Sequence, residues 1–436
     1  MEMGGGGKRI RRRACQPRPG LSTEHVWIVS RACRSLFLAV LAGMFPCWAM
    51  AQFNGSFAIE RFELDDENFL DWKAYQLPRR WHYESYTAPN RFQSSVGSIS
   101  LSRFYFFHQI DLEADLGPYL SFLYHQDEEA FFRSDSIYQE VELRAGSDVY
   151  GSILGWVEGD KRFDNIGFAA SYGKRTDWNY LRLSRVNQFQ LYNQKNAEGE
   201  KEALHYDETP VVVRFEARAI WQDRLFIQAD LRRDQPARFS DQGNGVKNGF
   251  EGRRGELTIE WWAEGRQWLA GATASLDEEK RRQSLLSTEG TVPELSQSLL
   301  LRWWDCYGSL QTVDSGVLTF GYLDALFENR ISSPDSASRF TTELTTQLVY
   351  ATWESHPSDW VHGLYGVYAG DAESITRKGD SGTRKGNEDR TQVKASAGLV
   401  LQEQGRYRFL FNSTWDLDLI EERAWDGGNV QVQLFF

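Results

Sequence analysis

Segments of about ten residues in which apolar and polar side chains alternate recur along this chain of 436 residues. In VVVRFEARAIW (211–221), Val213 and Phe215 alternate with Arg214 and Glu216, and the same pattern occurs in RLFIQADLR, GELTIEW, TQVKASAGLVL and RYRFLFNSTWDLD. Successive side chains of a β-strand point to opposite faces, so this pattern predicts strands with one apolar and one polar face. No segment after residue 51 approaches the roughly 20 apolar residues of a transmembrane helix.

The last ten residues, GGNVQVQLFF, carry the same alternation to the final position. Val430, Val432, Leu434 and Phe436 fall on one side of the strand, and Asn429, Gln431, Gln433 and Phe435 fall on the other. Terminal residues are usually disordered unless something ties them down. The pattern therefore predicts a final strand that is paired within a sheet.

The links between the predicted strands differ in length in a regular way. Long polar links at 191–208, 235–248, 279–293, 329–338 and 372–389 take turns with short links at 222–224, 263–266, 354–358 and 402–405. A soluble β-sandwich shows the same strand alternation. Links of 15 to 20 residues are uncommon in compact soluble domains, whereas long links on one side and tight turns on the other are typical of outer-membrane barrels. Roughly seventeen candidate strands follow residue 103, and bacterial barrels usually have even numbers, so we expect 16 or 18.

The N-terminal region has the features of an export signal. Arg31 and Arg34 precede the apolar run SLFLAVLAGMF (35–45), and the small residues of AMA (49–51) follow it. The run is too short to span a bilayer as a helix. We expect residues 1–51 to be a leader and signal peptide that is removed by cleavage after Ala51.

Removal of residues 1–51 changes the charge and the cysteine content. The leader holds eight Lys/Arg and two Asp/Glu, so 41 basic and 59 acidic residues remain, with a net charge of −18. Such an acidic chain is a poor nucleic-acid binder. Cys306 is the one cysteine left, which excludes an intramolecular disulfide, a cysteine-based zinc site and a CxxCH haem attachment. The sequence predicts no cofactor and no metal site. An acidic run that includes Asp416, Asp418 and Glu421 is more often a solvated edge than a cation site.

The signal-like segment, the alternating link lengths and the terminal Phe436 together resemble a porin-like bacterial outer-membrane β-barrel. The resemblance covers residues 52–436 and implies an all-β, transmembrane antiparallel barrel of 16 or 18 strands. It implies a barrel over 101–436 and a periplasmic or plug-like segment over 52–100 that could include the first strand. In this class the last strand resembles the sorting signal of the barrel-assembly machinery, and here Val430, Val432, Leu434 and Phe436 match that signal. Lipid and lipopolysaccharide of a Gram-negative outer membrane would surround the outer face.

The polar faces of the predicted strands supply candidate pore-lining residues. Opposite charges across a water-filled pore create a field that orders ions and small solutes, although for any single residue a structural pairing role is more common. The candidates are Arg182, Arg214, Glu216, Arg218, Asp230, Arg232, Glu256, Glu260, Arg302, Glu343, Lys394, Arg408, Asp416 and Asp418, and the same face carries Glu140, Glu142 and Arg144.

The resulting functional prediction is an outer-membrane channel for diffusion of hydrophilic solutes or ions, with a mild preference for cations. One alternative is a barrel that encloses a periplasmic partner such as a multihaem cytochrome, or that exports a polysaccharide. A second is an outer-membrane enzyme with a rim site at His205 or His362, but no histidine lies in a HExxH or GxSxG motif, so we expect no enzyme. A purely structural or adhesive barrel is disfavoured because barrels of this size leave internal space. The sequence leaves homo-oligomerisation open.

Overall fold

The computed structural model describes residues 90–99, 103–131, 134–158, 164–174, 177–187, 204–208, 211–241, 246–285, 294–312, 316–332, 340–378, 383–403, 406–418 and 425–435. The chain divides into two units, residues 1–52 and 53–436, and every described residue belongs to the second. The predicted signal peptide, most of the segment 52–100 and the terminal Phe436 lie outside the described residues.

The described part of the chain is almost entirely β-strand. The strands are β1 (Arg91–Ile99), β2 (Arg103–Gly117), β3 (Leu120–Phe131), β4 (Ser134–Gly146), β5 (Val149–Glu158), β6 (Asp164–Tyr172), β7 (Tyr180–Asn187), β8 (Leu204–Glu208), β9 (Val211–Trp221), β10 (Leu225–Asp241), β11 (Val246–Trp262), β12 (Trp268–Leu285), β13 (Leu295–Thr312), β14 (Gly316–Ser332), β15 (Phe340–Ser355), β16 (Val361–Lys378), β17 (Thr383–Glu403), β18 (Tyr407–Asp416) and β19 (Trp425–Phe435). One short 3₁₀ helix, η1 (Glu264–Arg266), lies between β11 and β12. Among these residues, no helix is long and apolar enough to cross a membrane.

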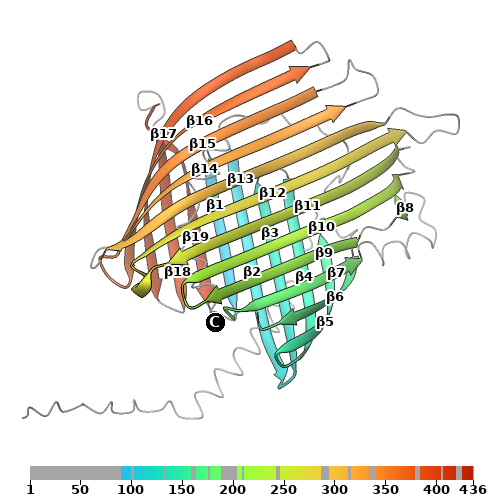
Figure 1. Cartoon of the computed structure of the whole chain (residues 1–436), viewed down its shortest axis with the longest axis horizontal. Coiled ribbons are helices and arrows are strands. Elements are labelled where there is room, and N and C mark those ends of the chain that lie inside the picture. The colour runs from blue at the N-terminus through green and yellow to red at the C-terminus, as the bar shows by residue number, and fades with distance from the viewer. Residues whose placement is uncertain are drawn as a thin grey trace, which may run out of the picture. The chain divides into compact units, whose positions relative to one another are not determined.

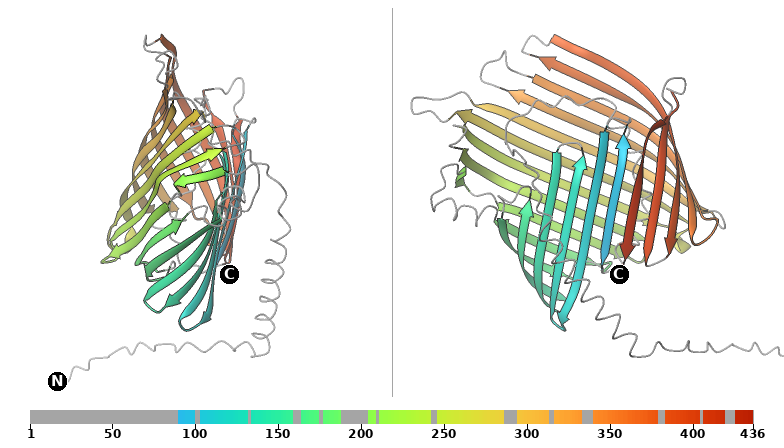
Figure 2. Two further views of the ribbon diagram at one scale, coloured as in Figure 1. Left: turned by 90° about the vertical axis from the view of Figure 1, so that its right-hand side faces the viewer. Right: turned by 180° about the vertical axis from the view of Figure 1, so that it is seen from behind.

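The strands form one closed antiparallel barrel (Figure 1). β1 pairs with β2 on one edge and with β19 on the other, from Arg91 opposite Phe435 to Ile99 opposite Gly427. Figure 2 shows this closure from behind, where the red C-terminal strand lies beside the blue N-terminal strand. Closure leaves no open edge, which a barrel in hydrocarbon requires because each unsatisfied backbone group costs several kcal/mol.

The wall has eighteen strand positions among the described residues, which confirms the larger of the two predicted numbers. Nineteen strands are present, but β8 and β9 share one position, because both pair with the same edge of β10. β9 pairs with the first part of β10 and β8 pairs with Arg238–Asp241. The first strand, β1, begins at residue 91, within the segment 52–100 that was left open for it.

On one side of the barrel the strands are longer, and they extend at the end opposite the short turns. The predicted long links 235–248 and 372–389 lie mostly within strands β10, β11, β16 and β17, and the prediction of loops there is wrong. On β10–β12 the extension is held by cross-strand charge pairs, for example Arg253 with Glu278 and Arg254 with Asp277 at 3.0 Å. Opposite charges on neighbouring strands stabilise pairing, so polar sequence on both faces does not end the strand.

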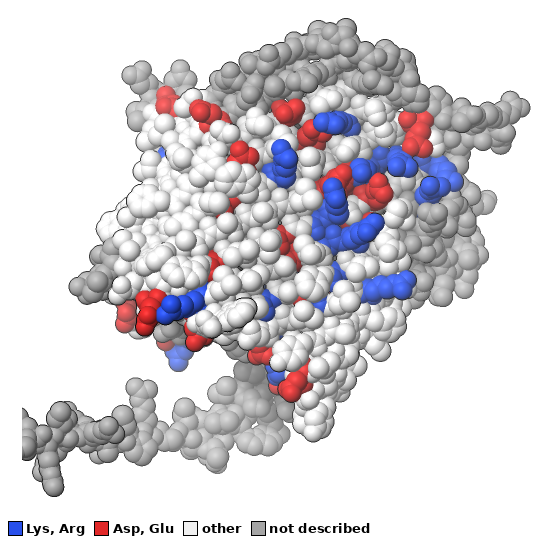
Figure 3. All heavy atoms as spheres, in the orientation of Figure 1, with Lys and Arg blue, Asp and Glu red and all other residues white. Residues whose placement is uncertain are grey.

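The outer face of the barrel is apolar, in contrast to an ordinary soluble protein. Phe168, Leu183, Trp221 and Val430 are each more than half exposed, while their sequence neighbours on the inner face, such as Arg182, are buried. Figure 3 shows a broad uncharged outer surface with the acidic and basic side chains gathered mainly toward strand ends. A large exposed apolar surface marks contact with lipid or with another protein. This arrangement is that of a transmembrane β-barrel with lipid outside.

Aromatic side chains lie near both ends of the outer face. Trp221 and Trp360 are exposed beside the short turns. Trp425 is exposed at the start of β19, which is at the opposite end of the barrel from the short turns. Trp178 and Trp303, in contrast, pack against the buried inner cluster. The three exposed residues suit the interfacial girdles that anchor barrels.

Two tyrosines on the inner face lie over glycines of the preceding strand. Tyr307 on β13 covers Gly271 on β12, and its hydroxyl reaches Glu260 on β11. Tyr350 on β15 covers Gly321 on β14 in the same way, and its hydroxyl donates to Asp305 on β13 at 3.0 Å. Each tyrosine thus links three successive strands. The glycine is required because a β-carbon at residue 321 would lie 2.2 Å from the Tyr350 ring.

Replacement of this glycine gives a direct test of the packing. Gly321→Ala should destabilise the barrel by about 1–3 kcal/mol, because the displaced Tyr350 ring loses its hydrogen bond to Asp305. Gly155→Ala is the matched control, since a β-carbon there meets no atom within 4 Å. Urea unfolding in detergent measures both variants, and equal stability of the two would contradict this role of the glycine.

Candidate functional site

The inner faces of β2–β4, β7 and β9–β11 carry many of the charged residues of the barrel. Alternation along each strand directs one side chain in two toward the inside. Register then aligns charged residues of adjacent strands, as in the row Arg182, Glu216, Asp230 and Glu256 across β7, β9, β10 and β11. The inner wall is therefore a set of charged rows, and its centre is the best candidate for a functional site.

Arg182 is the centre of this arrangement. Its guanidinium donates to Glu216 Oε2 at 2.6 Å, Glu140 Oε1 at 2.7 Å and Glu142 Oε2 at 3.0 Å. Its side chain is 1% exposed. Glu140 and Glu142 lie on β4, which β5 and β6 separate from β7. On their inner faces β5 and β6 present small residues, including Ser152, Ala169 and Ser171. Small intervening residues leave room for one arginine to reach across β5 and β6.

Two further arginines continue the pattern on either side. Arg144 binds Glu113 and donates to Ser121 Oγ at 3.2 Å. Arg214 binds Asp230 through two hydrogen bonds, of 3.0 and 2.6 Å, and approaches Glu216 at 3.4 Å. We call the resulting set the charge ladder; it comprises Glu113, Glu140, Glu142, Arg144, Arg182, Arg214, Glu216 and Asp230.

The charge ladder is buried at one end and accessible at the other. Arg144 and Arg182 are 1% exposed, whereas the side chains of Arg214 and Asp230 are 23% and 39% exposed. Buried charges must be paired because desolvation costs several kcal/mol per ion. The buried part therefore fixes the wall, and the Arg214–Asp230 end is the part that a solute can contact. Five carboxylates against three guanidiniums give the ladder a negative formal charge.

The inner faces of β13–β15 carry a large apolar cluster, beside buried polar residues such as Gln297 and Asp305. Leu299, Leu323, Leu344 and Leu348 on β13–β15 are each at most 2% exposed and belong to one cluster with the aromatic residues Phe226, Trp262, Tyr307, Tyr350 and Tyr368. Phe226 and Trp262 stack with ring centroids 6.0 Å apart. The inside of the barrel thus has one charged side and one apolar side.

Most of the predicted pore-lining residues lie on the inner face. Arg182, Arg214, Glu216, Arg218, Asp230, Arg232, Glu256 and Glu260 alternate with outward apolar residues on β7 and β9–β11. Lys394, Arg408 and Asp416 are buried on the inner face of β17 and β18, where Lys394 lies opposite Asp416. Asp418 follows β18 in a turn and accepts a hydrogen bond from the Val393 amide at 2.7 Å. A contribution of these residues to transport stays a prediction.

Arg302 and Glu343 differ from their predicted position. Arg302 is exposed on the face of β13 that also carries Trp304, and Glu343 alternates with the buried inward residues Thr342 and Leu344. Both therefore lie on the outer face. On β13 the inner face also carries large apolar residues, so polarity does not identify which side faces inward.

Several inner residues were not singled out in advance. Asp111 and Glu113 on β2 and His125 on β3 face inward, and His125 Nδ1 lies 2.7 Å from Asp111 Oδ1. The segment IDLEADL carries a clear alternation that could have identified the acidic pair. Glu354 and His356 at the short-turn end also come together with His362, the histidine named above as a possible rim site, although no sequence motif contains all three.

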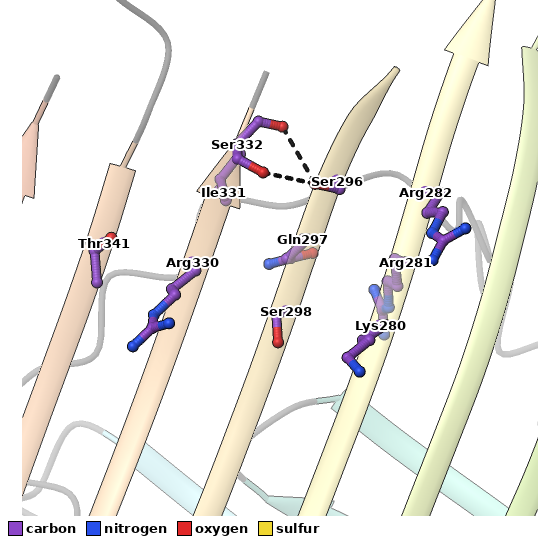
Figure 4. Close-up of a pocket in the computed structure, with 10 residues that line it drawn as sticks. All are labelled: Lys280, Arg281, Arg282, Ser296, Gln297, Ser298, Arg330, Ile331, Ser332 and Thr341. Carbon is purple, nitrogen blue, oxygen red and sulfur yellow. Dashed lines mark hydrogen bonds between the residues drawn. The ribbon is translucent and has the colours of Figure 1, made fainter. Parts of the chain in front are cut away.

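A separate pocket of about 350 Å³ lies near the far ends of β12–β15 (Figure 4). It is lined by Lys280, Arg281, Arg282 and Arg330 together with hydroxyl-bearing residues. Each basic side chain has a carboxylate within 4.0 Å; these partners are Glu251 and Glu278, Glu279, Glu294 and Glu328. The pocket therefore offers little uncompensated positive charge, and it is a weaker candidate than the charge ladder.

Comparison with known proteins finds distant structural similarities. No family model matches it, and no curated protein matches it in sequence. Solved structures that it resembles include a loop L8 deletion mutant of OmpT, an outer membrane protein of Vibrio cholerae, at 9% identity over 80% of this chain and 97% of that one, with a TM-score of 0.35. OccK10 (OpdN) of Pseudomonas aeruginosa matches at 9% identity over 80% and 98% (TM-score 0.33), and CdiB of Acinetobacter baumannii at 9% over 80% and 60% (TM-score 0.36).

The similarity to these proteins concerns the fold alone. The closed wall, the apolar outer face and the charged interior define the class: this chain is a porin-like, outer-membrane type β-barrel. The fold itself, an antiparallel barrel with eighteen strand positions, confirms the predicted fold class.

The dependence of the wall on Arg182 can be measured. Arg182→Ala leaves the buried Glu140 and Glu142 without their shared cation and should destabilise the barrel by about 3–5 kcal/mol. Arg224→Ala is the control, because the pair of Arg224 with Glu264 is exposed and should contribute about 0–1 kcal/mol. The free energy of unfolding from urea titration reports both, and a loss at Arg182 no larger than that at Arg224 would contradict the buried-hub interpretation.

Proposed function

We propose that this protein is a channel in the outer membrane of a Gram-negative bacterium, through which hydrophilic solutes or ions diffuse. The observation that carries the proposal is the accessible end of the charge ladder, where Arg214 and Asp230 face the interior. Rows of charged side chains along a pore wall select among permeating species by their charge. An apolar outer face supports the membrane location, and the barrel size supports an internal space.

The charge balance favours cations as the preferred ions. The ladder has more carboxylates than guanidiniums, and Glu256 continues its row on β11. The net charge of −18 over residues 52–436 points in the same direction, although loop charges contribute to that number. A negative wall raises the local concentration of cations.

Conductance of the folded barrel in a planar bilayer tests this function. We expect discrete current steps and, in a salt gradient, a reversal potential that shows cation preference. Arg214→Ala should increase the ratio of cation to anion permeability by several-fold at most, because a unit charge at 4 Å in water is worth about 1 kcal/mol.

Arg302→Ala is the matched control for that variant. It also removes one arginine from a membrane strand, but Arg302 lies on the outer face and should leave the reversal potential unchanged. A folded barrel that never conducts would refute the channel, and an equal shift in both variants would refute the assignment of the Arg214 end to the pore.

The apolar side of the interior favours a second candidate. A barrel that encloses a periplasmic partner, such as a multihaem cytochrome, or that exports a polysaccharide would use an inner surface with an apolar side such as the one on β13–β15. Aromatic rings there, including Trp303 and Tyr350, are suited to contact with apolar faces of a large passenger. A non-conducting barrel that co-purifies with a bound partner or a glycan would favour this candidate over the open channel.

A further inference from the structure

Three potential metal ligands converge at the short-turn end of the hairpin β15–β16. Glu354 is the last inward residue of β15, His356 follows in the turn and His362 is the first inward residue of β16. One ligand atom from each lies within 4.8 Å of the others. The cluster is remote in sequence from the charge ladder, and the proposed channel function does not use it.

The distances within the cluster match those around a single ion. His362 Nδ1 lies 2.9 Å from Glu354 Oε1, and His356 Nε2 lies 3.1 Å from the same oxygen. Two ligand atoms bound at 2.0–2.1 Å to one tetrahedral ion are separated by about 3.3 Å. The two imidazole rings also lie together, with centroids 4.1 Å apart.

Ordinary hydrogen bonding accounts for only part of this arrangement. His362 Nδ1 has hydrogen-bond geometry to Glu354, whereas His356 Nε2 is buried, close to the same carboxylate, and not aligned for a hydrogen bond. A buried ring nitrogen without such a partner is costly unless another group satisfies it. A bound cation would satisfy that nitrogen and the shared carboxylate oxygen together.

The surroundings hold the ligands in place. The Gln402 amide nitrogen on β17 lies 3.2 Å from His362 Nε2, on the side of the ring away from Glu354. When His362 Nδ1 binds a metal ion, Nε2 carries the proton, and a half-turn of the Gln402 amide presents its oxygen to accept that proton. A hydrogen-bond acceptor on the second ring nitrogen is the usual way in which a metal-binding histidine is oriented. Arg408 Nη2 lies 4.0 Å from Glu354 Oε1, so the guanidinium is at the edge of the cluster. Glu354 and His362 are buried, and the half-buried His356 leaves one side open to water.

From these contacts we propose that Glu354, His356 and His362 form a binding site for a divalent transition-metal ion. Two imidazoles and one carboxylate are ligands typical of Zn²⁺ and its neighbours, whereas Ca²⁺ and Mg²⁺ prefer oxygen ligands alone. Three protein ligands leave a fourth position for water or for a group from a solute or partner. The site would join the turn to both strands of the hairpin at one mouth of the barrel.

The test is zinc binding by the folded full-length barrel, purified without a histidine tag and treated with chelator. Competition with a chromophoric chelator should show one tight Zn²⁺ per chain, and Co²⁺ in its place should give the visible absorption of a site with nitrogen ligands. His356→Gln should weaken Zn²⁺ binding by at least about tenfold. His356 lies in a turn and is partly exposed, so this variant should fold; heat-modifiable migration on a gel checks that it does.

His125→Gln provides the matched control. His125 also contacts a carboxylate inside the barrel, at 2.7 Å from Asp111, but among the described residues it belongs to no group of three converging potential ligands. Unchanged binding in that variant, with loss in His356→Gln and Glu354→Gln, supports the site. Absence of stoichiometric Zn²⁺ binding by the parent protein, or equal loss in His125→Gln, overturns it. Since the readout is binding, the result is independent of whether the barrel conducts.

Discussion

The pairing of every strand edge is the constraint on which the rest of this structure depends. A strand in hydrocarbon has no water to satisfy its amides and carbonyls, so the sheet must close. Here β19 pairs with β1 over nine residue pairs, and that contact joins the two ends of the described chain. Closure also divides each strand into an inward and an outward face. Lipid-facing and interior chemistry are thereby decided residue by residue along the whole wall.

The charge ladder follows from that division. Inside a closed wall, side chains from several strands reach the same space, so one arginine can serve carboxylates from strands that do not pair with each other. Arg182 on β7 does this with Glu140 and Glu142 on β4 and Glu216 on β9. Burial of these charges requires that each be paired, which explains the density of contacts around a side chain that is 1% exposed. Toward β10 the charged side chains become more exposed, so the proposed transport role falls to that end of the row.

Sequence alternation predicted the barrel and much of its inner wall because, on β7 and β9–β11, the outward residues are apolar and the inward ones are charged. Arg214, Glu216 and Arg218 are clear examples. The rule fails where the inner face is apolar too. In LLLRWWDCYGSL both faces of β13 carry large apolar residues, and its two charges, Arg302 and Asp305, fall on opposite faces, so charge does not identify the inner side. It fails again on β15, where the outward Glu343 and the inward Thr342 are both polar and polarity carries no information about direction.

Contacts between strand ends are hidden from the sequence for a different reason. Glu354 and His362 are eight residues apart, a spacing without meaning until Ser355 is known to pair with Gly363. That register places the inward side chains on both sides of a short turn within reach of one another, and His356 in the turn completes the set. Every short turn of a barrel brings together inward residues in this way, so its mouth is a natural place for a compact site that no linear motif records. At this hairpin the residues brought together are two imidazoles and a carboxylate, a combination whose chemistry is specific enough to indicate a ligand.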